Sequence, residues 1–201
     1  PRRWPTNARP ISAPGGGSAS AAIAAVGAGL GAMVAKLTYG VRKFEHLESQ
    51  LRKIIPGLHE TALGLIPMID ADTNAFNDYV EAMRLPQGTD AEKKHRAEQM
   101  ELGLKKAIEV PLQTMRIGDK AWENMLEAAK IGNVASKSDV QVGARALEVG
   151  IWGAYQNVMI NVSGIKDSKF VSEKTAEAAK LKDRAAKFCA EILEVLDNRK
   201  N

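Results

Sequence analysis

The 201-residue chain contains one cysteine, Cys189, which excludes an intrachain disulfide and a zinc or iron–sulfur site built from cysteines. Its three histidines, His46, His59 and His95, show no HxxxH or HExxH spacing, so a histidine-based metal site is not expected either. We therefore expect a protein that needs no metal and no redox cofactor.

Aromatic residues are also scarce, at 5% of the chain, and no segment of four or more residues alternates cleanly between apolar and polar. Alanine, leucine, lysine and glutamate are abundant instead, a balance that favours helix over strand. The sequence therefore predicts an all-α fold, an antiparallel helical bundle with short connections.

Strong charge is lacking as well. The net charge of +4 is small and spread along the chain, so we expect no nucleic-acid partner, although a small polyanionic ligand would suit it. Residues 11–35 carry no charge, which is long enough to span a bilayer. They are mostly alanine, glycine and serine, and they lack the apolar core of a signal peptide. We expect a buried helix here and no membrane insertion.

The chain divides into an irregular lead-in, residues 1–12, and a helical domain, residues 13–201. It begins with Pro1 rather than methionine, which suggests a fragment of a longer protein. Ser18 is predicted to cap the first helix, Gly40 to end it, and Thr89 with Glu92 to form a capping box. The predicted helices cover approximately residues 18–39, 41–55, 58–83, 89–130, 136–162 and 168–198.

The pair Asp70 and Asp72 is the most informative local feature. The side chains three and four positions from Asp72 on a helix are all apolar: Met68, Ile69, Ala75 and Phe76. A carboxyl group on an apolar face loses hydration, which disfavours its charged form and suits it to exchanging protons near neutral pH. The structural alternative is an aspartate satisfied by a lysine or a backbone donor.

Two asparagines, Asn157 and Asn161, lie four residues apart in the uncharged run 149–165. An amide both donates and accepts hydrogen bonds, so this pair suits recognition of a heterocycle. The alternative is an interhelical hydrogen-bonded pair in the core of the bundle.

A glycine run precedes the first helix. Gly15, Gly16, Gly17 and Ser18 would present free backbone amides at a helix N-terminus, where an anion is favoured. We expect Arg42 and Lys43 nearby, as cations that attract an anionic ligand. The alternative is a flexible loop followed by an ordinary cap.

Seven short segments occur in an order typical of one family. The sequence resembles the cyclodeaminase domain of formimidoyltransferase-cyclodeaminase over about residues 11–197. The matching segments are Ala13–Ser18, Leu37–Gly40, Ile69–Asp72 with Ala75–Phe76, Glu81–Pro86, Val110–Leu112, Gly132–Asn133 with Ser138–Asp139, and Gly153–Tyr155 with Asn157 and Ile160–Asn161. Each is weak alone, but seven in register are specific. The helix that usually precedes the glycine run is absent, and so is a transferase domain.

The resemblance implies an all-helical homodimer that converts 5-formimidoyltetrahydrofolate into 5,10-methenyltetrahydrofolate and ammonia, a step of histidine degradation. It implies a folate site near the dimer interface, with Asp72 as the catalytic acid, and no cofactor beyond the folate, which is often polyglutamylated. When the domain is fused to a transferase, the family forms a ring of eight chains. It also implies a cytoplasmic location, with Golgi or centrosome association.

Two other functions stay open. A methenyltetrahydrofolate cyclohydrolase acts on the same folate and a similar carbon. A non-catalytic helical scaffold would instead bind cytoskeleton or Golgi through the lysine-rich last helix. The position of Asp72 on an apolar face, together with the glycine run, favours an enzyme, because a scaffold needs neither.

Overall fold

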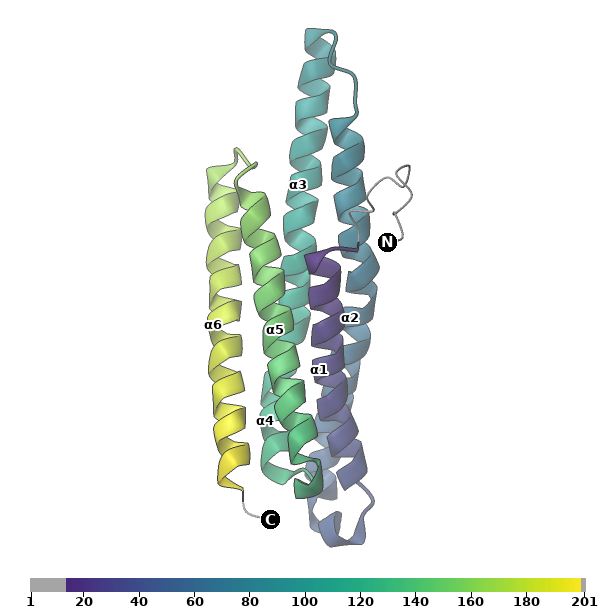
Figure 1. Cartoon of the computed structure of the whole chain (residues 1–201), viewed down its shortest axis with the longest axis vertical. Coiled ribbons are helices and arrows are strands. Elements are labelled where there is room, and N and C mark those ends of the chain that lie inside the picture. Colours follow the sequence, from purple (N-terminus) through teal and green to yellow (C-terminus); the bar gives the residue numbers. More distant parts are fainter. Residues whose placement is uncertain (1–13, 200–201) are drawn as a thin grey trace, which may run out of the picture.

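The computed structural model describes residues 14–199, and all regular structure in that range is helical. The lead-in predicted for residues 1–12 lies outside the described residues. The elements are α1 Gly16–Thr38, η1 Arg42–Leu47, α2 Glu48–Met83, α3 Asp90–Asp119, α4 Trp122–Ile131, η2 Val134–Ser136, α5 Lys137–Val162 and α6 Ser168–Asn198. The helices run up and down beside one another (Figure 1), which confirms the predicted all-α bundle.

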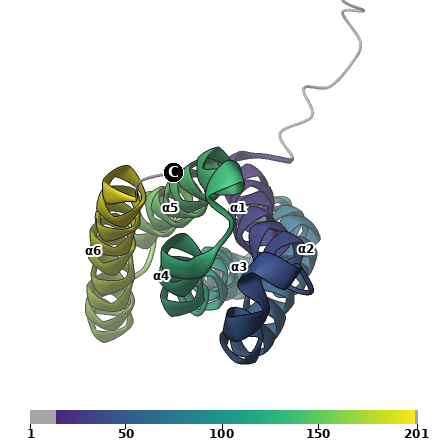
Figure 2. The ribbon, with the colours of Figure 1, turned by 90° about the horizontal axis from the view of Figure 1, so that it is seen from below.

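The helix α1 occupies a central position between α2 and α5 (Figures 1 and 2). α6 packs on the other side of α5, and α3 lies behind α1 and α5. The upper ends of α2 and α3 extend beyond the other helices as a two-helix arm (Figure 1). The buried side chains form one core that runs through α1 to α6.

Glycines hold α1 and α5 at backbone contact. A Cβ atom at Gly27 would lie 2.5 Å from the backbone nitrogen of Leu147, and one at Gly150 would lie 2.6 Å from the Cβ of Ala24. No side chain fits at either position, so the backbones of α1 and α5 approach each other closely there. Gly29, in contrast, faces open space.

α1 is long and apolar enough to cross a membrane when only length and composition are considered. Within the bundle, 56% of its most apolar 18-residue window is buried. A core helix of a soluble protein passes the same test, and α1 packs as one, mainly against α5 and α2.

The predicted helix end at Pro56 is wrong. After the short 3₁₀ turn η1, the single helix α2 continues through both Pro56 and Pro67. Leu51, Ile54 and Leu58 are buried on the same face on both sides of Pro56. Because Pro56 itself is exposed, water can solvate the carbonyl that loses its helical partner, and burial of the apolar face offsets the cost of the proline.

The helix predicted from about residue 89 to residue 130 divides into two. α3 passes Pro111 and ends at Asp119, and α4 begins at Trp122. The turn directs α4 against α6 and α2 and buries Trp122 and Met125 completely. The position of this break therefore depends on which side chains are buried by tertiary packing, and no local sequence signal marks it.

Several predicted boundaries are confirmed. Thr89 and Glu92 form the capping box, with a hydrogen bond in each direction. Gly40 follows the last residues of α1 with a φ of +76°, a left-handed conformation that glycine adopts at little cost. Ser18 is not the N-cap of α1, however. That position is Gly15, which offers no side chain, and Ser18 is the third residue of the helix.

Candidate functional site

Asp72 caps α1 from a different helix. The backbone nitrogen of Ser18 donates to Asp72 Oδ2 over 2.8 Å, and the Ser18 hydroxyl donates to the same oxygen over 2.9 Å. The first turn of a helix has backbone N–H groups without internal partners and carries a partial positive charge. Asp72, half-buried in α2, therefore supplies the acceptor that the residues of α1 lack.

The glycine run makes room for this carboxylate. A Cβ atom at Gly17 would lie 2.0 Å from Asp72 Oδ1 and 2.4 Å from its Cγ, so only glycine fits there. A Cβ atom at Gly16 would lie 3.3 Å from Asn157 Nδ2, a tight contact. The absence of side chains at the start of α1 thus lets α2 and α5 approach it closely.

A cavity of about 290 Å³ opens beside this contact, between α1, α2, α3 and α5. Its lining residues are Gly15, Gly16, Asp72, Thr73, Phe76, Tyr79, Ala107, Asn157, Ile160 and Asn161. Five of the residues selected from the sequence therefore meet at one cavity. The other two, Gly17 and Ser18, do not line the cavity. They contact Asp72 from the first turn of α1.

The two asparagines are anchored through their amide nitrogens. Asn157 Nδ2 donates to the carbonyl of Gly153 over 2.8 Å. Asn161 Nδ2 donates to the carbonyls of Asn157, over 2.8 Å, and of Ala107 in α3, over 3.2 Å. The structural alternative, an interhelical hydrogen bond, thus holds for Asn161. Neither side-chain oxygen accepts a hydrogen bond from a described residue, so the cavity wall offers two acceptors.

Half of the lining was not predicted from the sequence. Phe76 and Tyr79 lie four and seven positions after Asp72, so the helical period could have found them, whereas Thr73, the next residue after Asp72, does not follow that period. Ala107 and Ile160 come from other helices and carry no local signal. Phe76 is 38% exposed and Ile160 is 74% exposed, which gives the cavity an apolar edge.

The two aspartates of the motif lie on different faces of α2, as the helical spacing predicts. Asp70 is exposed, whereas Asp72 is half-buried. Asp72 forms no ion pair with any residue in the range 14–199. The same range contains no cluster of three His, Cys, Asp or Glu side chains placed to hold a metal ion.

The expected cations near the glycine run are not there. Arg42 and Lys43 belong to η1, which follows the far end of α1. At about 1.5 Å per residue, the 23 residues of α1 separate them from the glycine run by about 34 Å. The expectation was wrong because it treated neighbours of the helix in sequence as neighbours in space.

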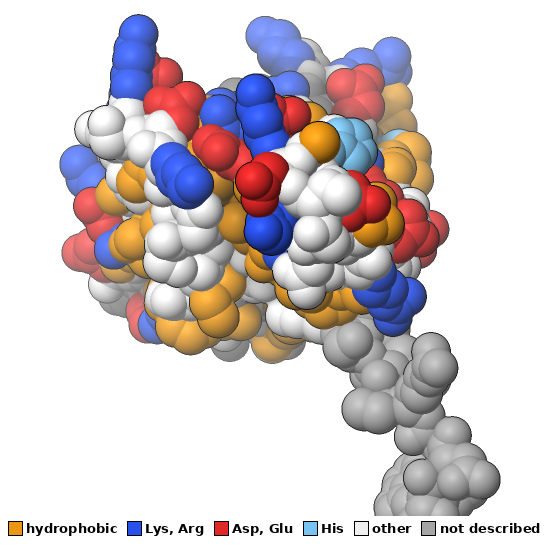
Figure 3. All heavy atoms as spheres, turned by 90° about the horizontal axis from the view of Figure 1, so that it is seen from above, with side chains coloured by type: hydrophobic (Ala, Val, Ile, Leu, Met, Phe, Trp, Pro, Cys, Tyr) orange, Lys and Arg blue, Asp and Glu red, His pale blue; other side chains and the backbone are white. Residues whose placement is uncertain are grey.

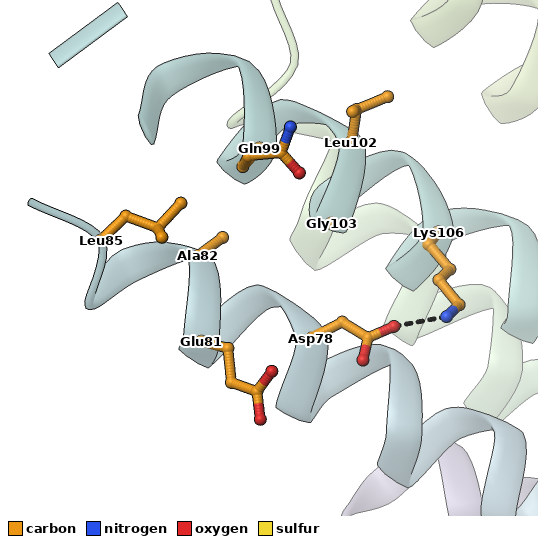
Figure 4. Close-up of a pocket in the computed structure, with 8 residues that line it drawn as sticks. All are labelled: Asp78, Glu81, Ala82, Leu85, Gln99, Leu102, Gly103 and Lys106. Carbon is orange, nitrogen blue, oxygen red and sulfur yellow. Dashed lines mark hydrogen bonds and ion pairs between the residues drawn. The ribbon is translucent and has the colours of Figure 1, made fainter. Parts of the chain in front are cut away.

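A second hollow lies on the two-helix arm, between α2 and α3 (Figure 4). Asp78 pairs with Lys106 across it, and Glu81 adds a further carboxylate. The charged side chains that line this hollow are therefore two acids and one base, which does not suit an anionic ligand. The hollow beside Asp72 is the better candidate for binding.

The fold and the cavity together define a class of protein, a helical bundle with one carboxyl group at a pocket of small-ligand size. The chain belongs to the formiminotransferase-cyclodeaminase family, whose model matches residues 6–180.

Among its relatives, formimidoyltransferase-cyclodeaminase of Dictyostelium discoideum is 50% identical over 94% of this chain, and that of Gallus gallus is 44% identical over the same share. The chain spans about a third of the length of these relatives, 34% and 35%. Methenyltetrahydrofolate cyclohydrolase of Methylorubrum extorquens is 34% identical, with 94% of this chain and 90% of the relative covered.

A solved structure confirms the fold. The crystal structure of formiminotetrahydrofolate cyclodeaminase from Thermotoga maritima superposes with a TM-score of 0.82 and covers 94% of this chain and 91% of its own. The two sequences are 22% identical. The bundle is thus shared at a sequence distance where only the fold can be transferred.

Proposed function

We propose that this chain is a formimidoyltetrahydrofolate cyclodeaminase, which converts 5-formimidoyltetrahydrofolate into 5,10-methenyltetrahydrofolate and ammonia. The observation that carries the proposal is the position of Asp72, a half-buried carboxyl group at a cavity otherwise lined by amide, hydroxyl, aromatic and aliphatic groups. The names of the relatives that are 40–50% identical support the same reaction.

The reaction requires two proton transfers at neighbouring atoms. N10 of the folate attacks the formimidoyl carbon and loses its hydrogen as a proton to the Asp72 carboxylate. The formimidoyl group reacts as its protonated amidinium, so the attack of N10 leaves a neutral NH2 group on the carbon. Asp72 then returns the N10 proton to this NH2 group, its bond to carbon breaks, ammonia leaves, and the positive charge stays on the methenyl product. The carbon stays bonded to N5 and N10, so one carboxyl group serves both transfers and ends in its starting state.

The remaining side chains suit the binding of a folate. The free oxygens of Asn157 and Asn161 can accept from the amino and ring N–H groups of a pterin. Phe76 and Tyr79 supply the aromatic surface that flat heterocycles prefer. The cavity holds the reacting end of the folate, and the glutamate tail extends past the apolar edge at Ile160.

The proposal is tested by measuring ammonia release from 5-formimidoyltetrahydrofolate with the purified chain. We expect ammonia and 5,10-methenyltetrahydrofolate in equal amounts. A folded preparation whose melting temperature rises with tetrahydrofolate, but which releases no ammonia, would refute the deaminase activity.

A second reaction is favoured by one specific observation. The Methylorubrum extorquens cyclohydrolase matches this chain over 90% of its own length, whereas the chain covers about a third of the two-activity relatives. Hydrolysis of 5,10-methenyltetrahydrofolate, assayed on the same preparation, distinguishes the two. Rapid hydrolysis without ammonia release would assign the chain to the cyclohydrolase.

We also propose that the chain forms a homodimer through α1 and α5. Both helices expose large apolar side chains, among them Val26, Leu37, Val149 and Trp152. Seen from above, hydrophobic side chains appear along the lower edge of the molecule, the side that faces the viewer in Figure 1 (Figure 3). An apolar face on two packed helices is typical of a protein–protein contact.

Sedimentation of matched variants tests the dimer. Val26→Asp charges the proposed interface, and Leu102→Asp charges the arm at a residue of equal exposure, 59%. We expect Val26→Asp to be monomeric and less active, and Leu102→Asp to stay dimeric. Full activity in a monomer would refute the requirement for a dimer.

Four expectations stay predictions. The enzyme is expected to work without a metal or a cofactor beyond the folate, and dialysis against a chelator should leave its turnover unchanged. It is expected to accept polyglutamylated folates. A cytoplasmic location with Golgi association, and a ring assembly in fusion with a transferase domain, rest on the family resemblance alone.

A further inference from the structure

We propose that Ser18 is a positioning residue that gives the two oxygens of Asp72 different tasks: Oδ2 is held by the protein, and Oδ1 carries the proton during turnover. This inference rests on the proposed function, because it concerns the acid–base role of Asp72. It changes the role of Ser18 that the sequence analysis assigned, from contact with the substrate to control of the carboxyl group.

The asymmetry between the two oxygens is the first observation. Oδ2 accepts two hydrogen bonds from one residue, the N–H of Ser18 over 2.8 Å and its hydroxyl over 2.9 Å. Oδ1 accepts none from the described residues and lies against Gly17, where a Cβ atom would be 2.0 Å away. The bound oxygen is thus occupied by the protein, while the other keeps its lone pairs for a proton.

The second observation is how the Ser18 hydroxyl is oriented. Its oxygen lies 3.1 Å from the Thr73 hydroxyl and 3.0 Å from the carbonyl of Ile69. The single hydrogen of Ser18 is best used on the charged carboxylate, since charge-assisted hydrogen bonds are the stronger ones. Thr73, which lines the cavity, then donates to Ser18 and strengthens its donation to Asp72. The result is a chain from Thr73 through Ser18 to Oδ2.

The hydrogen-bond chain from Thr73 through Ser18 is the main influence on the Asp72 carboxyl group, because the other residues that line the cavity carry no charge. α1 contributes no charged residue in its first turn, and α5 contributes the neutral Asn157. On α2, Asp70 is exposed on another face, and Tyr79 is the other titratable residue that lines the cavity. The Asp78–Lys106 pair of α2 and α3 lines the separate hollow of the arm.

Two consequences follow for turnover. An anchored Oδ2 fixes the plane of the carboxyl group, so Oδ1 meets N10 and the leaving nitrogen in one orientation. Because both donors bind Oδ2, Oδ1 is the oxygen that is left to accept the proton from N10. Ser18 therefore affects the rate of the chemical steps and leaves substrate binding almost unchanged.

The experiment compares Ser18→Ala with Ser20→Ala. Ser20 is a buried serine two residues further along α1, and its hydroxyl donates to the Gly16 carbonyl of its own helix. Both variants lose one buried hydroxyl, but only Ser18→Ala loses a bond to Asp72. We expect Ser18→Ala to lower kcat by about 10- to 100-fold with little change in KM, the size typical of a hydrogen bond to a charged group.

The split between kcat and KM separates positioning from a structural role. Loss of the anchor on Oδ2 should slow the chemical steps in Ser18→Ala, so kcat falls while KM and the melting temperature stay close to those of Ser20→Ala. Ser20→Ala should keep the kcat and KM of the unmodified chain. Identical kcat and KM values in the two variants would overturn the proposal.

The carbon-13 NMR signal of the Asp72 carboxyl group, recorded at one fixed pH, gives a readout without turnover. We expect this signal to move in Ser18→Ala and to stay in place in Ser20→Ala, even if the chain proves inactive on the folate. An inactive unmodified chain whose signal moves in Ser18→Ala would refute the proposed function but not the contact. An active chain with an unmoved signal would refute this inference alone.

A second pair of variants covers the case in which Ser18→Ala does not fold. Thr73→Val removes the hydroxyl that donates to Ser18, and Thr73→Ser retains it. We expect kcat to fall by about 2- to 10-fold in Thr73→Val and to recover in Thr73→Ser, because one neutral hydrogen bond is lost and restored. Equal kcat values in the two variants would contradict the hydrogen-bond chain.

Discussion

The first turns of α1 and α3 are capped in opposite ways. At α3, the cap is local: Thr89 and Glu92 exchange hydrogen bonds across three residues, on the exposed surface. At α1, the N-cap Gly15 has no side chain, and the acceptor is Asp72, 54 residues away on another helix. Both arrangements satisfy the same kind of backbone donor.

The difference shows how a helix end becomes a functional site. In both caps the hydrogen bonds go to one of the two carboxylate oxygens, Glu92 Oε2 at α3 and Asp72 Oδ2 at α1. The local cap lies on the exposed surface, where the backbone hydrogen bond from Thr89 lowers the pKa of Glu92, whereas the distant cap places the carboxylate of Asp72 at the edge of a cavity. The cap of α3 therefore serves stability, and the cap of α1 serves stability and chemistry together.

The largest effect is expected from Asp72→Asn, which keeps the cap and removes the acid. An asparagine oxygen still accepts from Ser18, so the fold and folate binding should persist. Turnover should fall by about 100- to 10,000-fold, the usual contribution of a general acid–base group. The measurement is ammonia release at saturating substrate.

The matched control is Asp70→Asn, in the same motif but exposed on another face of α2. It should retain most of the activity. Equal losses in the two variants would show that the motif acts through its overall charge and not through the position of one carboxyl group.

Gly17→Ala fills the space that the Asp72 carboxylate occupies when it caps α1. The new methyl group would overlap Asp72 Oδ1, so we expect a loss of about 1–3 kcal/mol of stability, typical of overpacking, together with reduced turnover. Gly29→Ala places the same change on the same helix with nothing within 4 Å. It should be neutral or stabilise by up to about 1 kcal/mol. Similar melting temperatures for the two variants would be inconsistent with the contact.

Thr89→Ala breaks the local cap. We expect a loss of about 1 kcal/mol of stability in urea unfolding, the usual cost of losing an N-cap side chain. Because α3 begins at the end of the arm, away from Asp72, kcat should not change. A drop in kcat larger than twofold would show that the two helix ends are coupled.

The smallest effect concerns an ion pair that joins α3 to α6. The hydrogen bond from Arg116 lowers the pKa of Glu177 below its ordinary value of 4.5, against the opposing effect of burial. A carboxyl group with a lowered pKa in the folded state adds stability above pH 4.5, and this stability is lost as the pH falls below that value. Thermal melts of Glu177→Gln should therefore show a shallower decline below pH 4.5. An unchanged decline would assign the acid sensitivity to other groups.

Much of the fold follows from local patterns. The capping box at Thr89, the left-handed Gly40 and the bounds of α6 depend on neighbouring residues, and the sequence predicted them. The continuation of α2 through Pro56 and the break before Trp122 depend on which face is buried by distant helices. A proline signal near a continuous apolar face was therefore outweighed by packing.

The residues of the site also divide into those that the sequence could predict and those that only the folded structure reveals. Asp72, Asn157 and Asn161 could be selected from the sequence because a polar side chain on an apolar stretch is costly to bury unless it has a partner. Ile160 could not, since an apolar residue carries no such signal until the structure places it at the cavity edge. Ser18 was predicted as the N-cap of α1, whereas its hydroxyl donates to Asp72, 54 residues away, and no local pattern marks that contact.

The central claim is tested most directly by a structure of the chain with 5-formimidoyltetrahydrofolate, or a stable analogue, bound. The account predicts the folate in the cavity beside the first turn of α1, with Asp72 Oδ1 within about 3 Å of N10 or of the departing nitrogen. A folate bound elsewhere, for example in the hollow of the arm beside Lys106, with Asp72 out of reach of the reacting atoms, would contradict it.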